Sequence, residues 1–217
     1  MRQNISLAEI SDGHLYKAND MVKADCGGCE GCSQCCRGMG SSIILDPYDV
    51  YRLTTGIGKS MQELLATSVE LNVVDGVILP NLKMQGTREA CAYLDVEGRC
   101  SIHPYRPGIC RLFPLGRHYE NGGLFYFLQT GECAKENRSK VSKWIDTPEL
   151  KRNEQFKLQW HDLLSAMTDR VAGEDEGKQR EENLLLLRLF YLLPYEGTTD
   201  FYSQFTERME HWNEQIG

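Results

Sequence analysis

The chain has 217 residues, of which 41% are hydrophobic and 25% charged, and a formal net charge of -7 at pH 7. This composition is ordinary for a globular protein with a buried core. The acidic balance argues against a nucleic-acid partner, because nucleic-acid binding relies on Lys and Arg side chains that neutralise phosphates. Residues 1–17 lack the basic start and apolar run of a secretion signal, and the longest apolar stretch, residues 184–193, is roughly half of a membrane span. We therefore expect a cytoplasmic protein without a membrane partner, in a compartment that keeps thiols reduced.

Cysteine is the residue type that points most directly to a function. Five of the nine cysteines fall within eleven residues near the N-terminus, and the other four are spread further along the chain. They are Cys26, Cys29, Cys32, Cys35, Cys36, Cys91, Cys100, Cys110 and Cys133. Thiolates separated by two residues can converge on one soft metal, because the intervening residues form a tight turn. A disulfide framework is the alternative, but it is typical of small secreted chains. We predict that these cysteines are metal ligands.

Two short helices are predicted after the first cysteine group. Asp46 before Pro47 is typical of an N-cap followed by proline at the first helical position, so a helix is expected over residues 48–53, ending at Gly56. A capping box that begins at Ser60 indicates a second short helix. Both helices are expected to serve as scaffold.

Two β-hairpins are predicted next along the chain. β-Branched residues on both sides of Asp75 and Gly76 favour a hairpin over residues 69–79, with a two-residue turn. A second pair of strands is predicted over residues 112–128, turning at residues 121–123. These strands are short, so no large sheet is expected.

Helical periodicity dominates after the last cysteine. A helix is predicted over residues 147–173, with apolar side chains at helical spacing. Residues 184–193 are predicted to form a buried helical segment that Pro194 ends, and residues 199–216 an amphipathic terminal helix. We expect the buried segment to pack over the cysteine-rich part or to form a homodimer contact, because an exposed apolar patch of this size would promote association.

The predicted fold class is α+β. An irregular cysteine-rich metal-binding region with short helices and hairpins is expected over residues 1–135. A helical extension, packed on that region, is expected over residues 136–217.

The cysteine motifs resemble those of a known family. The resemblance rests on the segments Cys29-Glu30-Gly31-Cys32-Ser33-Gln34-Cys35-Cys36-Arg37, Cys91-Ala92-Tyr93-Leu94, Cys100-Ser101-Ile102-His103 and Arg106-Pro107-Gly108-Ile109-Cys110-Arg111-Leu112-Phe113-Pro114. The chain resembles the bacterial YkgJ-type cysteine-cluster proteins, a zinc- or iron-chelating domain that is also related to the flagellin lysine N-methylases. The resemblance implies metal chelation over about half of the chain. Two departures are Cys26, an addition to the family cluster, and His103, which stands where tyrosine is common.

Four arginines lie near cysteines in the sequence, namely Arg37, Arg99, Arg106 and Arg111. A cation beside a sulfur favours the thiolate form and offsets the negative charge of an all-thiolate metal complex. We predict this role for Arg106 and Arg111 in particular, as residues that bind the cofactor.

Other candidate groups have weaker support. The Cys-x2-His spacing of Cys100 and His103 could ligate zinc, although an isolated histidine is more often packed or hydrogen-bonded. Asp12, Asp46 and Asp49 have no pairing pattern, and we interpret them as caps or solvated side chains. Phosphate-binding and serine-hydrolase motifs are absent from the sequence.

The adjacent cysteines Cys35 and Cys36 raise the question of how many centres there are. Neighbouring side chains of an extended backbone point to opposite sides. We therefore expect the doublet to join two four-thiolate centres, with Cys26 as a spare ligand.

Three functional hypotheses remain open. The first is an iron–sulfur protein, with a 4Fe-4S cluster, for electron transfer or redox sensing. The second is a zinc-binding structural or partner-recognition module. The third, a component of a methyl-transfer enzyme, is implied by the family resemblance alone.

Overall fold

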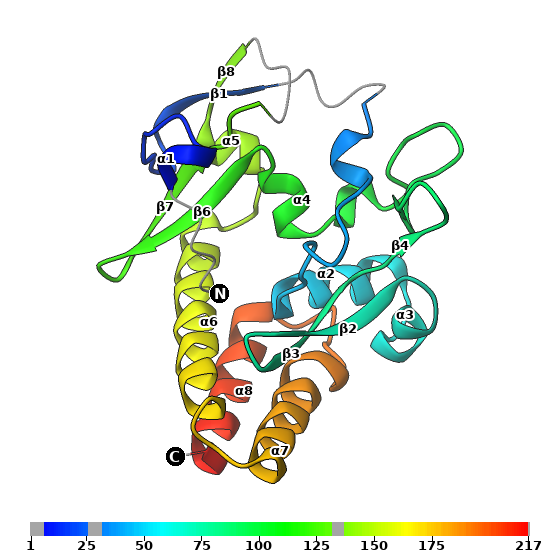
Figure 1. Ribbon diagram of the computed structural model, residues 1–217, viewed down its shortest axis with the longest axis vertical. Coiled ribbons are helices and arrows are strands. Elements are labelled where there is room, and N and C mark those ends of the chain that lie inside the picture. The colour runs from blue at the N-terminus through cyan, green and yellow to red at the C-terminus, as the bar shows by residue number, and fades with distance from the viewer. Residues whose placement is uncertain (1–6, 26–31, 132–136, 217) are drawn as a thin grey trace.

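The computed structural model describes residues 7–25, 32–131 and 137–216. Figure 1 shows three long helices, α6, α7 and α8, in the lower part of the molecule, with short paired strands both above them and beside them. The α-helices are α1 Leu7–Ile10, α2 Pro47–Ile57, α3 Met61–Thr67, α4 Gly108–Leu112, α5 Val141–Ile145, α6 Leu150–Val171, α7 Glu176–Leu187 and α8 Phe201–Ile216. Within these residues, two 3-10 helices, η2 Gln34–Cys36 and η3 His103–Tyr105, and a π-helix, η4 Arg188–Leu192, accompany them.

The strands form two-stranded antiparallel sheets. Within the described residues, the pairs are β1 with β8, β2 with β3, β4 with β5, and β6 with β7. The strands are β1 Met21–Asp25, β2 Val69–Val74, β3 Val77–Leu82, β4 Met84–Gln85, β5 Ala90–Cys91, β6 Leu115–Glu120, β7 Gly123–Leu128 and β8 Asn137–Lys140. This mixture of short hairpins and longer C-terminal helices confirms the predicted α+β class.

Helix α2 begins as predicted but ends later. The Asp46 side chain accepts a hydrogen bond from the Asp49 backbone N–H, and the Asp49 side chain accepts one from the Asp46 N–H, which closes a capping box. The helix continues through Gly56 and ends at Gly58, whose φ of 72° is the left-handed conformation that favours glycine. Gly56 serves packing instead, because a Cβ atom there would lie 2.3 Å from the ring of Tyr105.

The other local predictions in the N-terminal half are confirmed, with shifts in the hairpin ends: the first hairpin runs to residue 82 rather than 79. Ser60 caps α3 through the predicted box, and both hairpins turn where expected. The turn residues Asp75 and Gly76 have φ of 50° and 83°, and Asn121 and Gly122 have φ of 50° and 70°. Positive φ at both central positions is typical of tight hairpin turns. The second hairpin starts at residue 115 rather than 112, because residues 108–112 form α4.

The prediction that residues 184–193 are buried is confirmed for the centre of this segment and wrong at its two ends. Leu186, Phe190 and Tyr191 are at most 1% exposed, whereas Leu184 is 54% and Leu193 47% exposed. The chain passes from α7 into the π-helix η4 within this segment. The side chains at its centre are therefore covered by this chain itself, and a homodimer contact remains a prediction.

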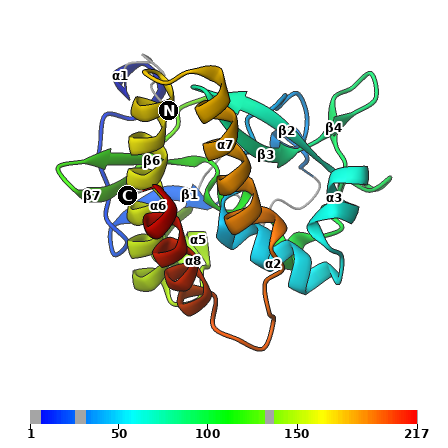
Figure 2. The same cartoon turned by 90° about the horizontal axis from the view of Figure 1, so that it is seen from below.

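The main hydrophobic core joins the two halves of the chain. Phe156 of α6 contacts Tyr48 of α2 and the rings of Phe201 and Phe205 of α8, with the two α8 rings edge-on at 5.1 and 4.7 Å between centroids. Figure 2 shows α6, α7 and α8 beside α2 in the view from below. A division of the chain near residue 135 remains a prediction, but these elements share one core.

A second, smaller core lies under the paired strands at the other end of the molecule. Its buried residues are Val22, Ala24, Leu112, Leu115, Tyr126, Val141 and Ile145. They come from β1, α4, β6, β7 and α5. Helix α4 therefore contributes to both cores: its Leu112 belongs to this cluster, while its Ile109 and Cys110 pack against the main core.

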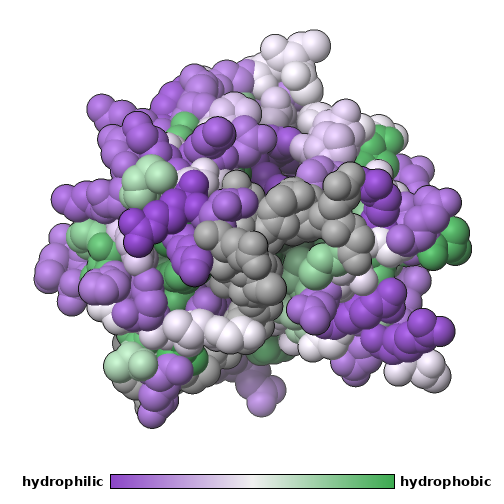
Figure 3. Space-filling view, turned by 90° about the horizontal axis from the view of Figure 1, so that it is seen from above, coloured by the Kyte–Doolittle hydropathy of each residue, from purple (hydrophilic) through white to green (hydrophobic). Residues whose placement is uncertain are grey.

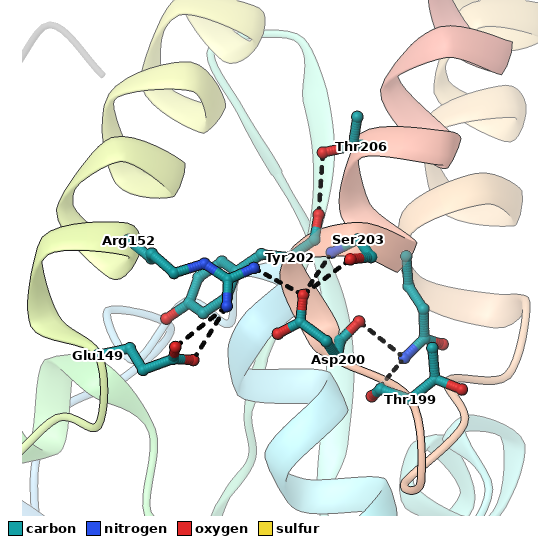
Figure 4. Close-up of polar contacts among 8 residues, drawn as sticks. Glu149, Arg152, Thr199, Asp200, Tyr202, Ser203 and Thr206 are labelled. Atoms are coloured by element: carbon teal, nitrogen blue, oxygen red, sulfur yellow. Dashed lines mark hydrogen bonds and ion pairs between the residues drawn. The ribbon is translucent and has the colours of Figure 1, made fainter.

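Polar contacts fix the start of α6 against the start of α8 (Figure 4). Arg152 Nη2 donates to Asp200 Oδ2 at 2.7 Å, and Arg152 Nη1 donates to Glu149 at 3.1 Å. Asp200 also accepts from the backbone N–H and the hydroxyl of Ser203, both at 2.9 Å. The guanidinium lies 4.5 Å from the ring centre of Tyr202. These contacts are largely exposed, so they orient the helices more than they stabilise the fold.

The surface matches the composition. The face in Figure 3, seen from above, is mostly hydrophilic, with hydrophobic residues in small separate groups. None of the helices in residues 7–25, 32–131 and 137–216 has the length and hydropathy of a membrane span.

Candidate metal centre

One cavity of about 290 Å³ brings together cysteines that are far apart in sequence. Its cysteine lining is Cys32, Cys35, Cys36, Cys91, Cys100 and Cys110. These residues come from η2 and the segment before it, from β5, from the turn after β5 and from α4. The remaining three, Cys26, Cys29 and Cys133, lie outside the described residues. The fold thus gathers six thiols at one place, and their role as ligands remains a prediction.

The doublet Cys35 and Cys36 differs from the sequence expectation. Both side chains line the same cavity, because the doublet lies in the 3-10 helix η2 and not in an extended segment. A 3-10 helix turns about 120° per residue, so adjacent side chains can face one side. The Cys36 thiol donates a hydrogen bond to the Cys35 sulfur, which lowers the pKa of Cys35 to about 7 and raises the pKa of Cys36. The expectation that the side chains of Cys35 and Cys36 point to opposite sides is therefore wrong. The number of metal centres remains open.

Burial governs the other thiols. Burial raises the pKa values of Cys91, Cys100 and Cys110 above the usual thiol value. The pKa of Cys110 is raised further by the charge of Asp49 and then by the neighbouring sulfurs of Cys91 and Cys35, because each disfavours another negative charge nearby. Without a cation these three thiols hold their protons. A metal ion bound among them would reverse this preference, because a coordinating thiol is deprotonated.

Backbone N–H groups point at two of these sulfurs. The N–H of Tyr93 donates to Cys91, and the N–H of Ile102 donates to Cys100, two residues after the cysteine in each case. A donor to the thiolate lowers the thiol pKa, which opposes the effect of burial. The donor set therefore fits a soft, thiolate-binding metal in its chemistry.

The described cysteines surround the cavity without meeting at a point. Among residues 7–25, 32–131 and 137–216, no three His, Cys, Asp or Glu side chains are close enough together to hold one metal ion. The cavity volume of about 290 Å³ is roughly ten times the share of one water molecule in the liquid. The arrangement therefore offers more room than a single ion needs.

Arg106, Arg99 and His103 also line the cavity. Arg106 favours the thiolate forms of Cys35 and Cys100 by its charge. Arg106 Nη1 lies 2.8 Å from His103 Nε2, and since arginine can only donate, Nε2 is the acceptor. Burial, with the two arginines, lowers the pKa of His103 and keeps the ring neutral. In this neutral ring Nδ1 carries the proton, so neither ring nitrogen of His103 offers a free lone pair to a metal while the contact with Arg106 is made.

Arg37 and Arg111 do not line the cavity. Arg37 Nε donates to the Ser33 hydroxyl at 3.4 Å, beside η2. Arg111 is 5% exposed, and the negative charge that most favours its charged form is that of Asp49. The predicted contact of Arg111 with a cofactor is thus not direct in this structure, and any effect of its charge acts through the wall of the cavity.

Sequence patterns did not indicate the apolar wall of the cavity. Its members are Ile43, Leu82, Met84, Tyr93, Ile102, Phe113 and Trp144. Trp144 comes from α5, well beyond the cysteine motifs, and its Nε1 donates to the Leu112 carbonyl at 3.2 Å. An isolated tryptophan in a short helix has no spacing pattern that would have identified it. This wall limits water around the thiols.

Comparison with known families agrees with the position of the cavity. Residues 28–126 match the CxxCxxCC family model, described as a putative zinc- or iron-chelating domain. No curated protein and no solved structure matches the chain. The described cysteines that line the cavity lie within the matched region, whereas Trp144 and helices α5 to α8 lie outside it.

Proposed function

We propose that this chain, whose residues 28–126 match the CxxCxxCC model of a zinc- or iron-chelating domain, holds an iron–sulfur cluster through its cysteine thiolates and serves in electron transfer or redox sensing. Metal binding through the cysteines is supported by the family match. The choice of an iron–sulfur cluster, of the 4Fe-4S type, is our proposal.

The single observation behind this choice is the size of the space that the thiols enclose. Six cysteines line about 290 Å³, and no described group of three could grip one ion as the side chains stand. A mononuclear zinc site needs four donors about 2.3 Å from one point. A cluster places its iron atoms at several points, so thiolates that are spread around a cavity can each reach one.

The other residues of the cavity have separable tasks. Arg106 offsets the negative charge of the thiolates, and the N–H groups of Tyr93 and Ile102 donate to sulfurs. Hydrogen bonds to sulfur and exclusion of solvent are two factors that set the reduction potential of such a centre. Trp144 and the neighbouring apolar side chains limit access of water. When bound, an iron–sulfur cluster supplies one-electron redox chemistry.

A zinc-binding structural or partner-recognition module is the second candidate, because the family description names zinc and iron equally. The methyl-transfer role, and the relation to flagellin lysine N-methylases, remain predictions from the resemblance alone.

A matched pair of variants tests the proposal. The protein is loaded anaerobically with iron and sulfide, and bound iron, sulfide and the visible spectrum are measured for wild type, Cys100→Ser and Ser101→Ala. Ser101 is adjacent, exposed and not part of the cavity lining. We expect Cys100→Ser to lose or alter the cluster absorption and Ser101→Ala to keep it. Wild-type protein that takes up zinc but no iron and sulfide under these conditions would contradict the proposal.

A further inference from the structure

Asp49 is a buried carboxylate that joins two distant parts of the chain. The residue is 2% exposed, and its Oδ1 accepts a hydrogen bond from the Gly108 N–H at 2.6 Å. Its Oδ2 accepts from the Asp46 N–H at 3.2 Å, within the capping box of α2. The same carboxylate therefore caps α2 and holds the first residue of α4, which is 59 positions away in sequence.

Charged side chains from three elements converge on this point. A Cβ atom at Gly108 would lie 3.4 Å from Asp49 Oδ1, 3.3 Å from Arg117 Nη2 and 3.5 Å from Lys157 Nζ. Lys157, on α6, also forms an ion pair with Asp46. Opposite charges and hydrogen bonds of this kind are what make buried carboxylates tolerable. The cluster draws on α2, β6 and α6, so it depends on the complete fold.

The position of this cluster matters because α4 supplies Cys110. Gly108 is two residues before Cys110, and α4 has only five residues, too few to be stable alone. Its start is held by Asp49, and its last residue, Leu112, accepts a hydrogen bond from Trp144. The position of the Cys110 sulfur in the cavity therefore depends on Asp49 and Trp144, two residues that lie outside the cysteine motifs.

We infer that Asp49 is a positioning residue of the metal centre, which fixes the start of α4 and thereby holds Cys110 at the cavity. The inference rests on the proposed function in that it assigns the residue to a metal centre. Asparagine cannot replace the carboxylate fully, because it has one oxygen for two N–H donors and its NH₂ group would face the second donor.

The test compares Asp49→Asn with Asn183→Ala. Asn183 is a matched control: it is 4% exposed, and its Oδ1 accepts from the Ile78 N–H at 2.6 Å, which joins α7 to β3 away from the cavity. Metal retention is measured by titration of the loaded protein with a chelator, and folding by circular dichroism. We expect Asp49→Asn to lose metal at about tenfold lower chelator concentration than wild type, the effect typical of residues that support ligands. Asn183→Ala should retain metal like wild type even where its stability falls.

Labelling of Cys110 in the metal-free protein separates this inference from the proposed function. If wild type binds no iron, the proposed function fails, but Cys110 should still react with a thiol reagent about tenfold faster in Asp49→Asn than in wild type. Each rate is first corrected for the thiolate fraction read from its own pH profile, because loss of the Asp49 charge alone also lowers the pKa of Cys110. Unchanged metal retention and unchanged labelling in a folded Asp49→Asn protein would overturn the inference. If Asp49→Asn does not fold, hydrogen exchange of the Gly108 amide in the wild-type protein tests the inference instead. A Gly108 amide that exchanges as fast as an exposed loop amide would overturn the inference.

Discussion

Replacing Phe156 by alanine should destabilise the metal-binding region and the helical half together. Phe156 is 1% exposed, lies on α6, and packs on Tyr48 of α2 and on Phe201 and Phe205 of α8. Truncating a buried phenylalanine costs about 3–5 kcal/mol, through lost transfer free energy and the cavity left behind. We expect about 4 kcal/mol here, because two edge-on ring pairs with α8 and the ring contact with Tyr48 of α2 are lost at once.

The assay is urea unfolding of the metal-loaded protein, followed by far-UV circular dichroism for the helices and by metal release for the cysteine region. Both probes should report one transition, which Phe156→Ala shifts to lower urea by the same amount. Gln159→Ala, on the exposed side of α6, should change the unfolding free energy by less than about 0.5 kcal/mol. Two separate transitions, or a Phe156→Ala effect on circular dichroism alone, would refute the shared core.

Three further predictions concern single sites. Burial lowers the pKa of Lys157 from its ordinary value of 10.5 to about 7, so between these two pH values the unfolded chain binds more protons than the folded one. The unfolding free energy should therefore rise with pH in this range, by up to about 1.4 kcal/mol per pH unit relative to Lys157→Met. Parallel pH profiles of the two proteins would refute this. Gly56→Val should cost about 1–3 kcal/mol in thermal or urea unfolding, because the side chain would enter the ring of Tyr105, and an unchanged midpoint would contradict that packing. Because Cys35 and Cys36 line one cavity, Cys35→Ser and Cys36→Ser should each change the same bands in the visible spectrum of the metal-loaded protein. Two different spectra, with half of the metal lost in each variant, would instead show two centres.

Features set by neighbouring residues were predictable from the sequence. The capping boxes at Asp46 and Ser60 and the turns at Asp75 and Asn121 form where predicted, because a few adjacent residues determine them. The cysteine spacing likewise indicated a metal site, and the fold brings six of the cysteines to one cavity.

Features that depend on distant partners were not predictable. Asp49 was interpreted as a cap or solvated side chain; it does cap α2, yet it is buried, because Gly108 lies against it in the fold. Lys157 is buried on the inward-facing side of α6. A buried lysine cannot be predicted from the spacing of apolar residues, because that spacing identifies only apolar residues as buried. The prediction that the side chains of Cys35 and Cys36 point to opposite sides was wrong for the same reason. Whether a short segment is extended or 3-10 helical depends on the residues that pack around it.

The most direct test of the central claim is the metal content of the protein purified without oxygen. Iron, acid-labile sulfide and zinc are measured per chain on the same sample as the visible spectrum. Anaerobic handling is needed because zinc can occupy a thiolate site that has lost iron. We predict iron and sulfide in equal amounts, with the broad visible absorption of sulfur-to-iron charge transfer. A colourless protein with stoichiometric zinc and no sulfide would contradict the proposed iron–sulfur centre.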